Sequence, residues 1–149
     1  MTTIACDGKS MAGDGLCCDH FDTIVNTAKT KVFRLRDGRL VGGAGNSGDV
    51  DSWRQWVDGG KIGDCPVQEE QFGALILETD GRILWVDHKG REVETPAPVA
   101  IGSGQDFAYG AMAAGVSPER AVEIACARDS KSGGKITVLH LEPKLKEVA

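Results

Sequence analysis

The sequence predicts an α+β fold in which antiparallel strands pack with helices. Three Asp-Gly pairs each separate two short apolar or alternating runs, and this pair favours a tight hairpin because both of its residues tolerate positive φ. The helical stretches lie between the strands rather than after each of them, which favours antiparallel sheets over a doubly wound parallel sheet. A chain of 149 residues with 41% hydrophobic residues is long enough for one buried core, so we predict a single domain over residues 1–149.

Three hairpins and one further strand follow from these runs. The last strand is expected over Lys135–Leu141, because its apolar residues alternate between two faces. The hairpins join Thr2–Cys6 to Ser10–Gly13 through Asp7-Gly8, Lys31–Arg36 to Arg39–Gly43 through Asp37-Gly38, and Phe72–Thr79 to Arg82–Asp87 through Asp80-Gly81.

Three helices are predicted between these strands. The clearest begins after Ser117, which can cap its first turn and is followed by proline and glutamate, two residues that suit a helix start. A second runs over about Gln105–Ala114, and a third over roughly Asp49–Asp58. We interpret the polar, glycine-rich stretch Gly59–Gln71 as a loop and expect the charged tail Glu142–Ala149 to fray.

Composition and charge exclude several classes of partner. The chain has 17 basic and 22 acidic residues, a net charge of -5 and no block of like charge, which argues against nucleic acid or an anionic membrane as a partner. The N-terminus has no signal-peptide pattern, and no apolar run is long enough to cross a bilayer. Five cysteines without a secretion signal favour reduced thiols. We therefore expect a soluble, cytoplasmic protein whose partners are proteins or peptides.

Neither a metal nor a nucleotide cofactor is expected. The adjacent pair Cys17-Cys18 is followed by Asp19 and His20, but the second ligand cluster of a typical metal site is missing. The glycine-rich stretch Gly42–Gly48 lacks the Gly-Lys-Ser/Thr ending of a phosphate-binding loop. The sequence therefore directs attention to the chemistry of its own side chains.

Thr2 is a candidate nucleophile once Met1 is removed. A small residue after an initiator methionine is ordinary, and by itself it indicates only that the methionine is trimmed. A threonine at a free N-terminus, however, holds a hydroxyl nucleophile and an amine that can act as its general base within one residue. The interest of Thr2 depends on the motifs that follow it.

Five motifs follow Thr2 along the chain. Taken singly, each is also explained by a turn, an exposed strand charge or a plain loop, but those explanations do not account for their order. In this order and approximate spacing the set resembles the proteasome β-subunit family, including its bacterial HslV branch, over most of the chain. The motifs are Ala12-Gly13-Asp14, Lys31-Val32-Phe33-Arg34-Leu35, Gly43-Ala44-Gly45, Ile101-Gly102-Ser103-Gly104 and Arg128-Asp129-Ser130-Lys131-Ser132-Gly133-Gly134.

The resemblance implies a fold and an activity. The fold is the N-terminal nucleophile (Ntn) hydrolase type, a four-layer αββα sandwich of two antiparallel sheets with outer helices. One helix is expected to be shortened or missing, because Gly59–Gln71 is too short and polar for the family's second long helix. The implied activity is that of a threonine-type peptidase that forms an acyl-enzyme on Thr2. The resemblance further implies an oligomeric ring and a peptide or unfolded protein as substrate, and it leaves a ring ATPase partner open.

Carried over position by position, the resemblance also assigns roles. Thr2 is the nucleophile, Asp14 and Lys31 are its charged partners, and Gly45 supplies the backbone N–H for the developing oxyanion. An ammonium beside the hydroxyl favours its ionised form, and a glycine lets the backbone come close to a substrate carbonyl. The polar shell around Thr2 comprises Ser103, Asp129 and Ser132, and the substrate-binding positions are Cys17, Gly43 and Ser47.

Two alternatives to a peptidase stay open from the sequence. The first is an Ntn amidase that uses the same nucleophile on a small amide. The second is a catalytically silent, structural subunit of a ring assembly. Thr2, Asp14 and Lys31 are all present and no propeptide precedes Thr2, which favours activity. A glycine at position 43 would leave the substrate pocket open, so we expect a broad or apolar preference.

Overall fold

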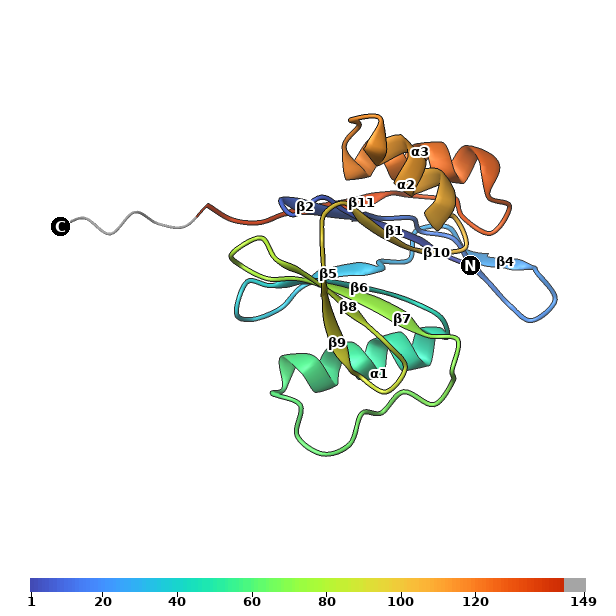
Figure 1. Cartoon of the computed structure of the whole chain (residues 1–149). Helices are drawn as coiled ribbons and strands as arrows, with labels where there is room; N and C mark the ends of the chain where they lie inside the picture. Colours follow the sequence, from blue (N-terminus) through green and yellow to red (C-terminus); the bar gives the residue numbers. More distant parts are fainter. Residues whose placement is uncertain (144–149) are drawn as a thin grey trace.

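The computed structural model describes residues 1–143. Most of the charged tail predicted over Glu142–Ala149 lies outside these residues. Two antiparallel sheets lie face to face, with two helices on the outside of one sheet and one helix on the outside of the other (Figure 1). The predicted four-layer αββα sandwich is therefore confirmed.

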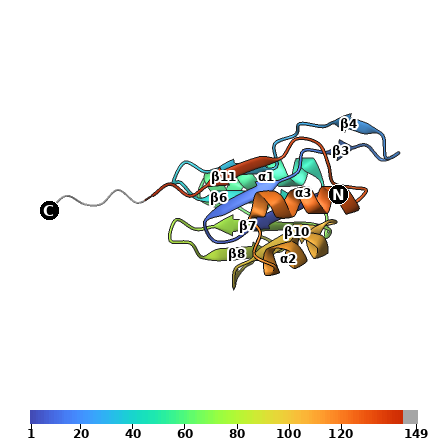
Figure 2. The same cartoon turned by 90° about the horizontal axis from the view of Figure 1, so that it is seen from above.

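The first sheet carries the N-terminus of the chain. Its four strands are ordered β10 (Val99–Gly102), β1 (Thr3–Cys6), β2 (Ser10–Gly13) and β11 (Thr137–His140). Its outer face is covered by two helices, α2 (Gln105–Ala113) and α3 (Pro118–Arg128), which lie side by side over the sheet (Figure 2).

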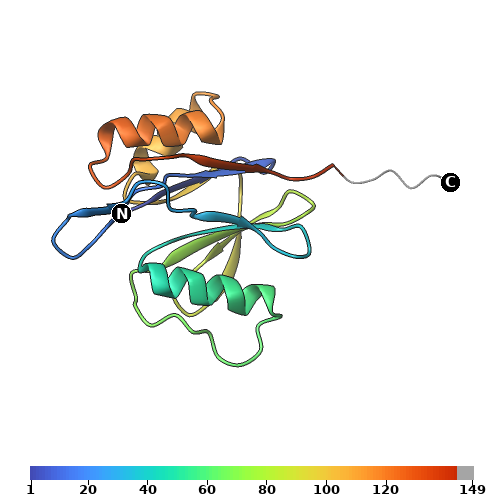
Figure 3. The ribbon, with the colours of Figure 1, turned by 180° about the vertical axis from the view of Figure 1, so that it is seen from behind.

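The second sheet is wider, and a single helix covers its outer face. Its strands are ordered β5 (Val32–Arg34), β6 (Leu40–Ala44), β7 (Gly73–Leu77), β8 (Ile83–Val86) and β9 (Glu92–Thr95). The covering helix is α1 (Ser47–Asp58). A separate small hairpin, β3 (Cys17–Cys18) with β4 (Ile24–Asn26), projects from the body of the molecule on the side of the N-terminus (Figure 3).

Strand alternation divides the buried residues among the layers. In β1, Ile4 faces the other sheet while Ala5 faces the helices, and in β2, Met11 and Ala12 do the same. The alanines on the outer face have little bulk, so α2 and α3 can approach the first sheet closely. Period-two patterning thus places large side chains between the sheets and small ones under the helices.

The three Asp-Gly hairpins form as predicted. Gly8, Gly38 and Gly81 take φ values of 91°, 94° and 95°, a region that favours glycine. A further hairpin between β8 and β9 was missed because its turn ends in Lys89-Gly90 and its second strand, Glu-Val-Glu-Thr, is an exposed edge. The sequence also does not indicate the strands β3, β4 and β10. The first two are very short, and β10 overlaps the motif at residues 101–104.

The predicted helices and the predicted loop are confirmed, with small shifts of the helix ends. The hydroxyl of Ser117 accepts a hydrogen bond from the Arg120 N–H at 3.2 Å, which is the expected cap of α3. Helix α1 begins two residues earlier than predicted, because the side chain of Asn46 caps it. Between α1 and β7 the chain forms a loop without a second helix.

Trp53 on α1 is the largest fully buried side chain. It packs edge to face against Phe72, with 5.8 Å between the ring centroids. Trp53→Ala should lower the free energy of unfolding by about 3–5 kcal/mol, because it leaves a large cavity between α1 and the second sheet. Trp53→Phe keeps an aromatic ring there and should cost much less. Urea denaturation measures both, and a loss below about 1 kcal/mol for Trp53→Ala would contradict this packing.

Candidate active site

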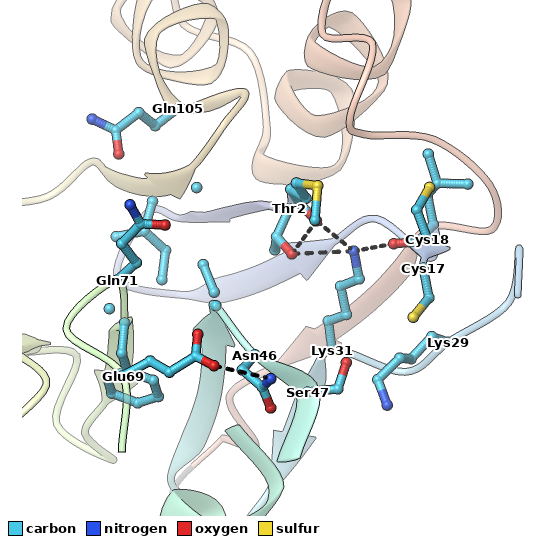
Figure 4. A pocket seen from close by; sticks show the side chains of 18 of the residues that line it. Thr2, Cys17, Cys18, Lys29, Lys31, Asn46, Ser47, Glu69, Gln71 and Gln105 are labelled. Carbon is cyan, nitrogen blue, oxygen red and sulfur yellow. Dashed lines mark hydrogen bonds between the residues drawn. The ribbon is translucent and has the colours of Figure 1, made fainter. Parts of the chain in front are cut away.

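Thr2 lies immediately before β1, buried beside the ammonium group of Lys31. The Lys31 Nζ donates to the Thr2 Oγ1 at 3.2 Å (Figure 4). The same hydroxyl donates to the carbonyl oxygen of Met1 at 2.6 Å. The predicted nucleophile therefore meets its predicted cationic partner directly.

Lys31 is held by a buried ion pair with Asp14. Their charged atoms are 3.0 Å apart, and the side chains are 7% and 0% exposed. The Lys31 Nζ also donates to the carbonyl of Leu16 at 2.6 Å. The carboxylate of Asp14 in turn accepts the backbone N–H groups of Thr3, Leu16 and Gly133. Both charges thus have the partners that a buried ion requires.

A second polar network reaches the backbone nitrogen of Thr2. This nitrogen donates to the Ser103 Oγ at 3.1 Å, and Ser103 donates to the Asp129 carboxylate at 2.6 Å. Ser132 donates to the same Asp129 oxygen at 2.6 Å and shares a hydrogen bond with the Thr3 hydroxyl. The three residues predicted for the polar shell therefore form one connected cluster behind Thr2.

Asp129 is charged at neutral pH because its hydrogen bonds outweigh its burial. Burial acts to raise the pKa of its carboxyl, but the hydroxyls of Ser103 and Ser132 and the Lys131 N–H all stabilise the carboxylate, so the pKa lies below its ordinary value. At neutral pH a negative charge therefore lies next to the serine that binds the Thr2 nitrogen.

Gly45 follows β6 in a conformation that favours glycine. Its φ is 134°, and an added Cβ would lie 2.6 Å from the carbonyl oxygen of Gln71. Any side chain at this position would collide with the neighbouring backbone. Gly45 lines the same cavity as Thr2, so a substrate placed against Thr2 can come close to its backbone.

Thr2, Lys31 and Gly45 open into a cavity of about 850 Å³. Cys17 and Ser47, two of the three predicted substrate-binding residues, line this cavity. Gly43 is not among the lining residues, and its role in substrate binding stays a prediction. Strand alternation turns Gly43 toward α1, where an added Cβ would meet Val50 at 2.9 Å.

The sequence does not indicate several of the lining residues. Asn46, Glu69, Gln71 and Gln105 line the cavity with the predicted residues. Glu69 and Gln71 belong to the stretch that the sequence identified only as a polar loop. The only sign of their role in the sequence is that they come just before the apolar run of β7. A loop that leads into a central strand ends at the edge of the sheet, where the cavity lies.

Two of the cysteine thiols are protonated at neutral pH. Burial raises the pKa of Cys6 to about 12 and that of Cys126 to about 11.

Cys17, Cys18, Asp19 and His20 line the cavity, yet within residues 1–143 no three histidine, cysteine, aspartate or glutamate side chains gather as metal ligands would. In the same residues, no helix has the length and apolar character needed to cross a bilayer.

Comparison with known proteins assigns the family. The chain is 34% identical to proteasome subunit beta type-5 of Gallus gallus across an alignment of 149 positions, which covers 91% of this chain and 54% of that relative. It thus spans about half the length of the curated relative it matches. Its structure resembles the crystal structure of eukaryotic HslV from Trypanosoma brucei with a TM-score of 0.71 and 22% identity, over 93% of this chain and 99% of that chain. No family model matches the sequence.

The chain belongs to the proteasome and HslV-like family of Ntn hydrolase folds. This member has the reduced set of helices that its sequence predicts, with one helix on the second sheet and a loop over residues 59–72. The loop brings Glu69 and Gln71 to the cavity, so the wall on this side is built from irregular chain.

Lys31→Met is expected to destabilise this family member strongly. The change leaves the Asp14 charge buried without its cation, and breaking a buried ion pair in this way costs about 3–5 kcal/mol. Lys29→Met is a matched control, because Lys29 also lines the cavity but is not among the ion-pair partners of Asp14. Chemical denaturation at neutral pH compares the two. Equal losses of unfolding free energy in the two variants would show that breaking the Asp14–Lys31 pair costs no more than removing the charge of Lys29.

The lowered pKa of Asp129 predicts how the stability of the Asp129 cluster depends on pH. A carboxyl whose pKa is lower in the folded state stabilises fully above its unfolded pKa, about 3.9, and the stabilisation is lost as pH falls through the folded value. Wild type should therefore be more stable than Asp129→Asn at pH 6, and the difference should shrink at pH 3. Unfolding free energies at the two pH values test this, and a constant difference would contradict it.

Proposed function

We propose that the chain, once it begins at Thr2, is a threonine-type peptidase that cleaves peptide bonds through an acyl-enzyme on Thr2. The observation that supports this most is the position of Thr2 between two networks. Its hydroxyl lies 3.2 Å from the Lys31 ammonium, and its backbone nitrogen lies 3.1 Å from the Ser103 hydroxyl. A nucleophile and the nitrogen that would become its base are thus each held by a polar partner.

In the proposed reaction the free amine of Thr2 takes the proton from Oγ1, and the oxygen attacks the substrate carbonyl carbon. The Lys31 ammonium stabilises the negative charge on Oγ1 as it develops. The carbonyl oxygen becomes an oxyanion that the Gly45 N–H would bind. Collapse breaks the C–N bond, and the proton held by the amine passes to the leaving nitrogen. Water then hydrolyses the ester and frees Thr2.

Met1 must be removed for this chemistry. While Met1 is attached, the Thr2 nitrogen belongs to a peptide bond, and its delocalised lone pair cannot take a proton. The Met1 carbonyl oxygen also accepts a hydrogen bond from the Thr2 hydroxyl at 2.6 Å. Burial, and then Lys31, lower the pKa of the Met1 amine against the opposing effect of Asp129 and Asp14.

The cavity favours a peptide over a small amide as substrate. Its volume of about 850 Å³ lies near the upper end of the range for ligand pockets, about 300–1,000 Å³. Cys17 and Ser47 themselves are small and uncharged, so we expect a broad or apolar preference at the positions they contact. A panel of short fluorogenic peptides that is cleaved only after acidic residues would contradict this preference.

A homo-oligomer is part of the proposal, because the chain is related to a protein named as a subunit. Phe21, Ile24 and Val25 on the projecting β3–β4 hairpin are more than half exposed, and exposed apolar groups of this kind are typical of protein contacts. We place the active form in a ring and leave the ATPase partner as a further proposal. If Met1 is retained, the same assembly would contain this chain as a catalytically silent subunit.

The decisive experiment is intact-mass analysis after incubation with an epoxyketone, an electrophile that reacts with both the hydroxyl and the amine of an N-terminal threonine. We expect a wild-type chain that lacks Met1 and gains one adduct, and no adduct for Thr2→Ala. Lys31→Ala should slow adduct formation by at least about a hundredfold, since it removes a charge-stabilising donor. Thr79→Ala, at an exposed turn far along the chain, is the matched control and should react like wild type.

Retention of Met1, or a wild-type chain without Met1 that gains no adduct, would contradict the proposed peptidase. Either result would favour the silent structural subunit. An adduct on wild type together with hydrolysis of small amides but not of peptides would instead favour the amidase.

A further inference from the structure

The wall of the cavity opposite Cys17 is formed by residues 68–72, the 68–72 segment, which leads into β7. Glu69, Gln71 and Phe72 from this segment line the cavity. The segment is irregular, but it is fixed to the body of the molecule at both ends. Its conformation therefore depends on a few contacts made by α1 and by Gly45.

Asp49 on α1 holds the first end of the segment. Its side chain is buried, and its two carboxylate oxygens accept the backbone N–H groups of Gln68 at 3.1 Å and Glu69 at 3.0 Å. Asp49 lies in the first turn of α1, where the helix dipole favours a negative charge. A buried carboxylate with two N–H donors is thus used to fix the backbone on which the Glu69 side chain stands.

The second end is held by packing. Phe72 is buried against Trp53 of α1, and the backbone around Gln71 lies so close to Gly45 that an added Cβ there would be 2.6 Å from the Gln71 carbonyl oxygen. The backbone of Glu69 is held by Asp49, while its side chain is exposed and lines the cavity. The segment thus has a defined position even though it forms no helix or strand.

The side chain of Asn46 reaches the Glu69 carboxylate. The Asn46 Oδ1 caps α1 by accepting the N–H groups of Gly48 and Asp49. Its Nδ2 donor group therefore points away from the helix, and it donates to the Glu69 Oε1 at 3.5 Å (Figure 4). This contact is long and exposed, and it does not neutralise the carboxylate, because the amide carries no charge.

The other charged side chains of the cavity have partners of their own or lie across the cavity from Glu69. Lys31 is paired with Asp14 and Asp22 with Lys131. The carboxylate of Asp19 accepts the N–H groups of Phe21 and Thr23. His20 and Lys29 are the other basic side chains of the lining, and Figure 4 shows Lys29 on the Cys17 side of the cavity, across from Glu69. Within residues 1–143, Glu69 has no cationic partner among the ion pairs of the structure.

We propose that Glu69 is a specificity residue that favours substrates with a basic side chain near the scissile bond, and that Asp49 is the residue that positions it. The inference rests on the proposed peptidase and adds a charge preference on the side of the cavity away from Cys17. A lysine or arginine side chain of a bound peptide would supply the cation that this carboxylate lacks. Because Glu69 is exposed, the expected gain is that of a solvent-accessible ion pair, about three- to fivefold in affinity.

Peptide binding by the full chain carrying Thr2→Ala tests this without any turnover. Two fluorescent peptides that differ only by lysine or norleucine at positions around the scissile bond are titrated by anisotropy at low and high salt. The lysine peptides should bind about three- to fivefold more tightly at low salt, and the difference should shrink at high salt. Adding Glu69→Gln should remove it, whereas Glu70→Gln, at the neighbouring exposed residue that does not line the cavity, should leave it unchanged.

Asp49→Asn tests the positioning role. An amide can accept one backbone N–H but presents its own donor to the other, so the 68–72 segment should loosen and the lysine preference should fall although Glu69 is intact. Far-UV circular dichroism and thermal unfolding establish that this variant is folded. Equal binding of lysine and norleucine peptides, or a preference that survives Glu69→Gln, would overturn the inference. Lysine-selective binding that Glu69→Gln removes, in a protein whose wild type forms no epoxyketone adduct, would instead overturn the peptidase and leave Glu69 as a residue that binds basic peptides.

Discussion

The buried ion pair between Lys31 and Asp14 is the interaction on which the geometry of the site depends. Lys31 comes from the segment that precedes β5, and Asp14 follows β2, so the pair joins the two sheets at the edge where Thr2 lies. The Asp14 carboxylate also binds the N–H of Gly133, just before β11. Removing two charges from water is costly, and this fold meets the cost with four hydrogen-bond partners for the carboxylate. The resulting ammonium has a fixed place beside the Thr2 hydroxyl.

The start of α1 has a comparable role on the other side of the cavity. Gly45 supplies the close approach, Asn46 caps the helix and contacts Glu69, and Asp49 holds the backbone of the 68–72 segment. One helix terminus thus fixes the backbone proposed to bind the oxyanion and the loop that faces it. The absence of a helix between α1 and β7 makes this arrangement necessary, because an irregular loop needs local anchors to keep a defined shape.

Much of the fold could be predicted from local chemistry, whereas contacts between distant segments could not. Asp-Gly turns and the Ser117 cap depend on neighbouring residues, and the structure has them where the sequence indicated. The grouping of Thr2, Asp14 and Lys31 followed only from resemblance. The direction of Gly43 depends on strand parity, which turns it toward Val50, and its motif alone does not indicate this. The grip of Asp49 on Gln68 joins residues nineteen apart, and no periodicity signals such a pair.

The register of β1 decides which of two adjacent threonines can be the nucleophile. Thr2 and Thr3 point in opposite directions, so Thr2 meets Lys31 while the Thr3 hydroxyl is engaged by Ser132. Pairing of Thr3 with Gly102 of β10 fixes this register, and two glycines keep it: a Cβ at Gly102 would lie 2.0 Å from the Thr2 carbonyl oxygen, and one at Gly104 would lie 2.0 Å from the Thr3 hydroxyl. A slip of one residue would exchange the two hydroxyls and also bury the wrong face of the strand. The tight β1–β10 contact therefore places Thr2, rather than Thr3, beside Lys31. Thr2 is also the residue whose peptide nitrogen becomes a free amine when Met1 is removed.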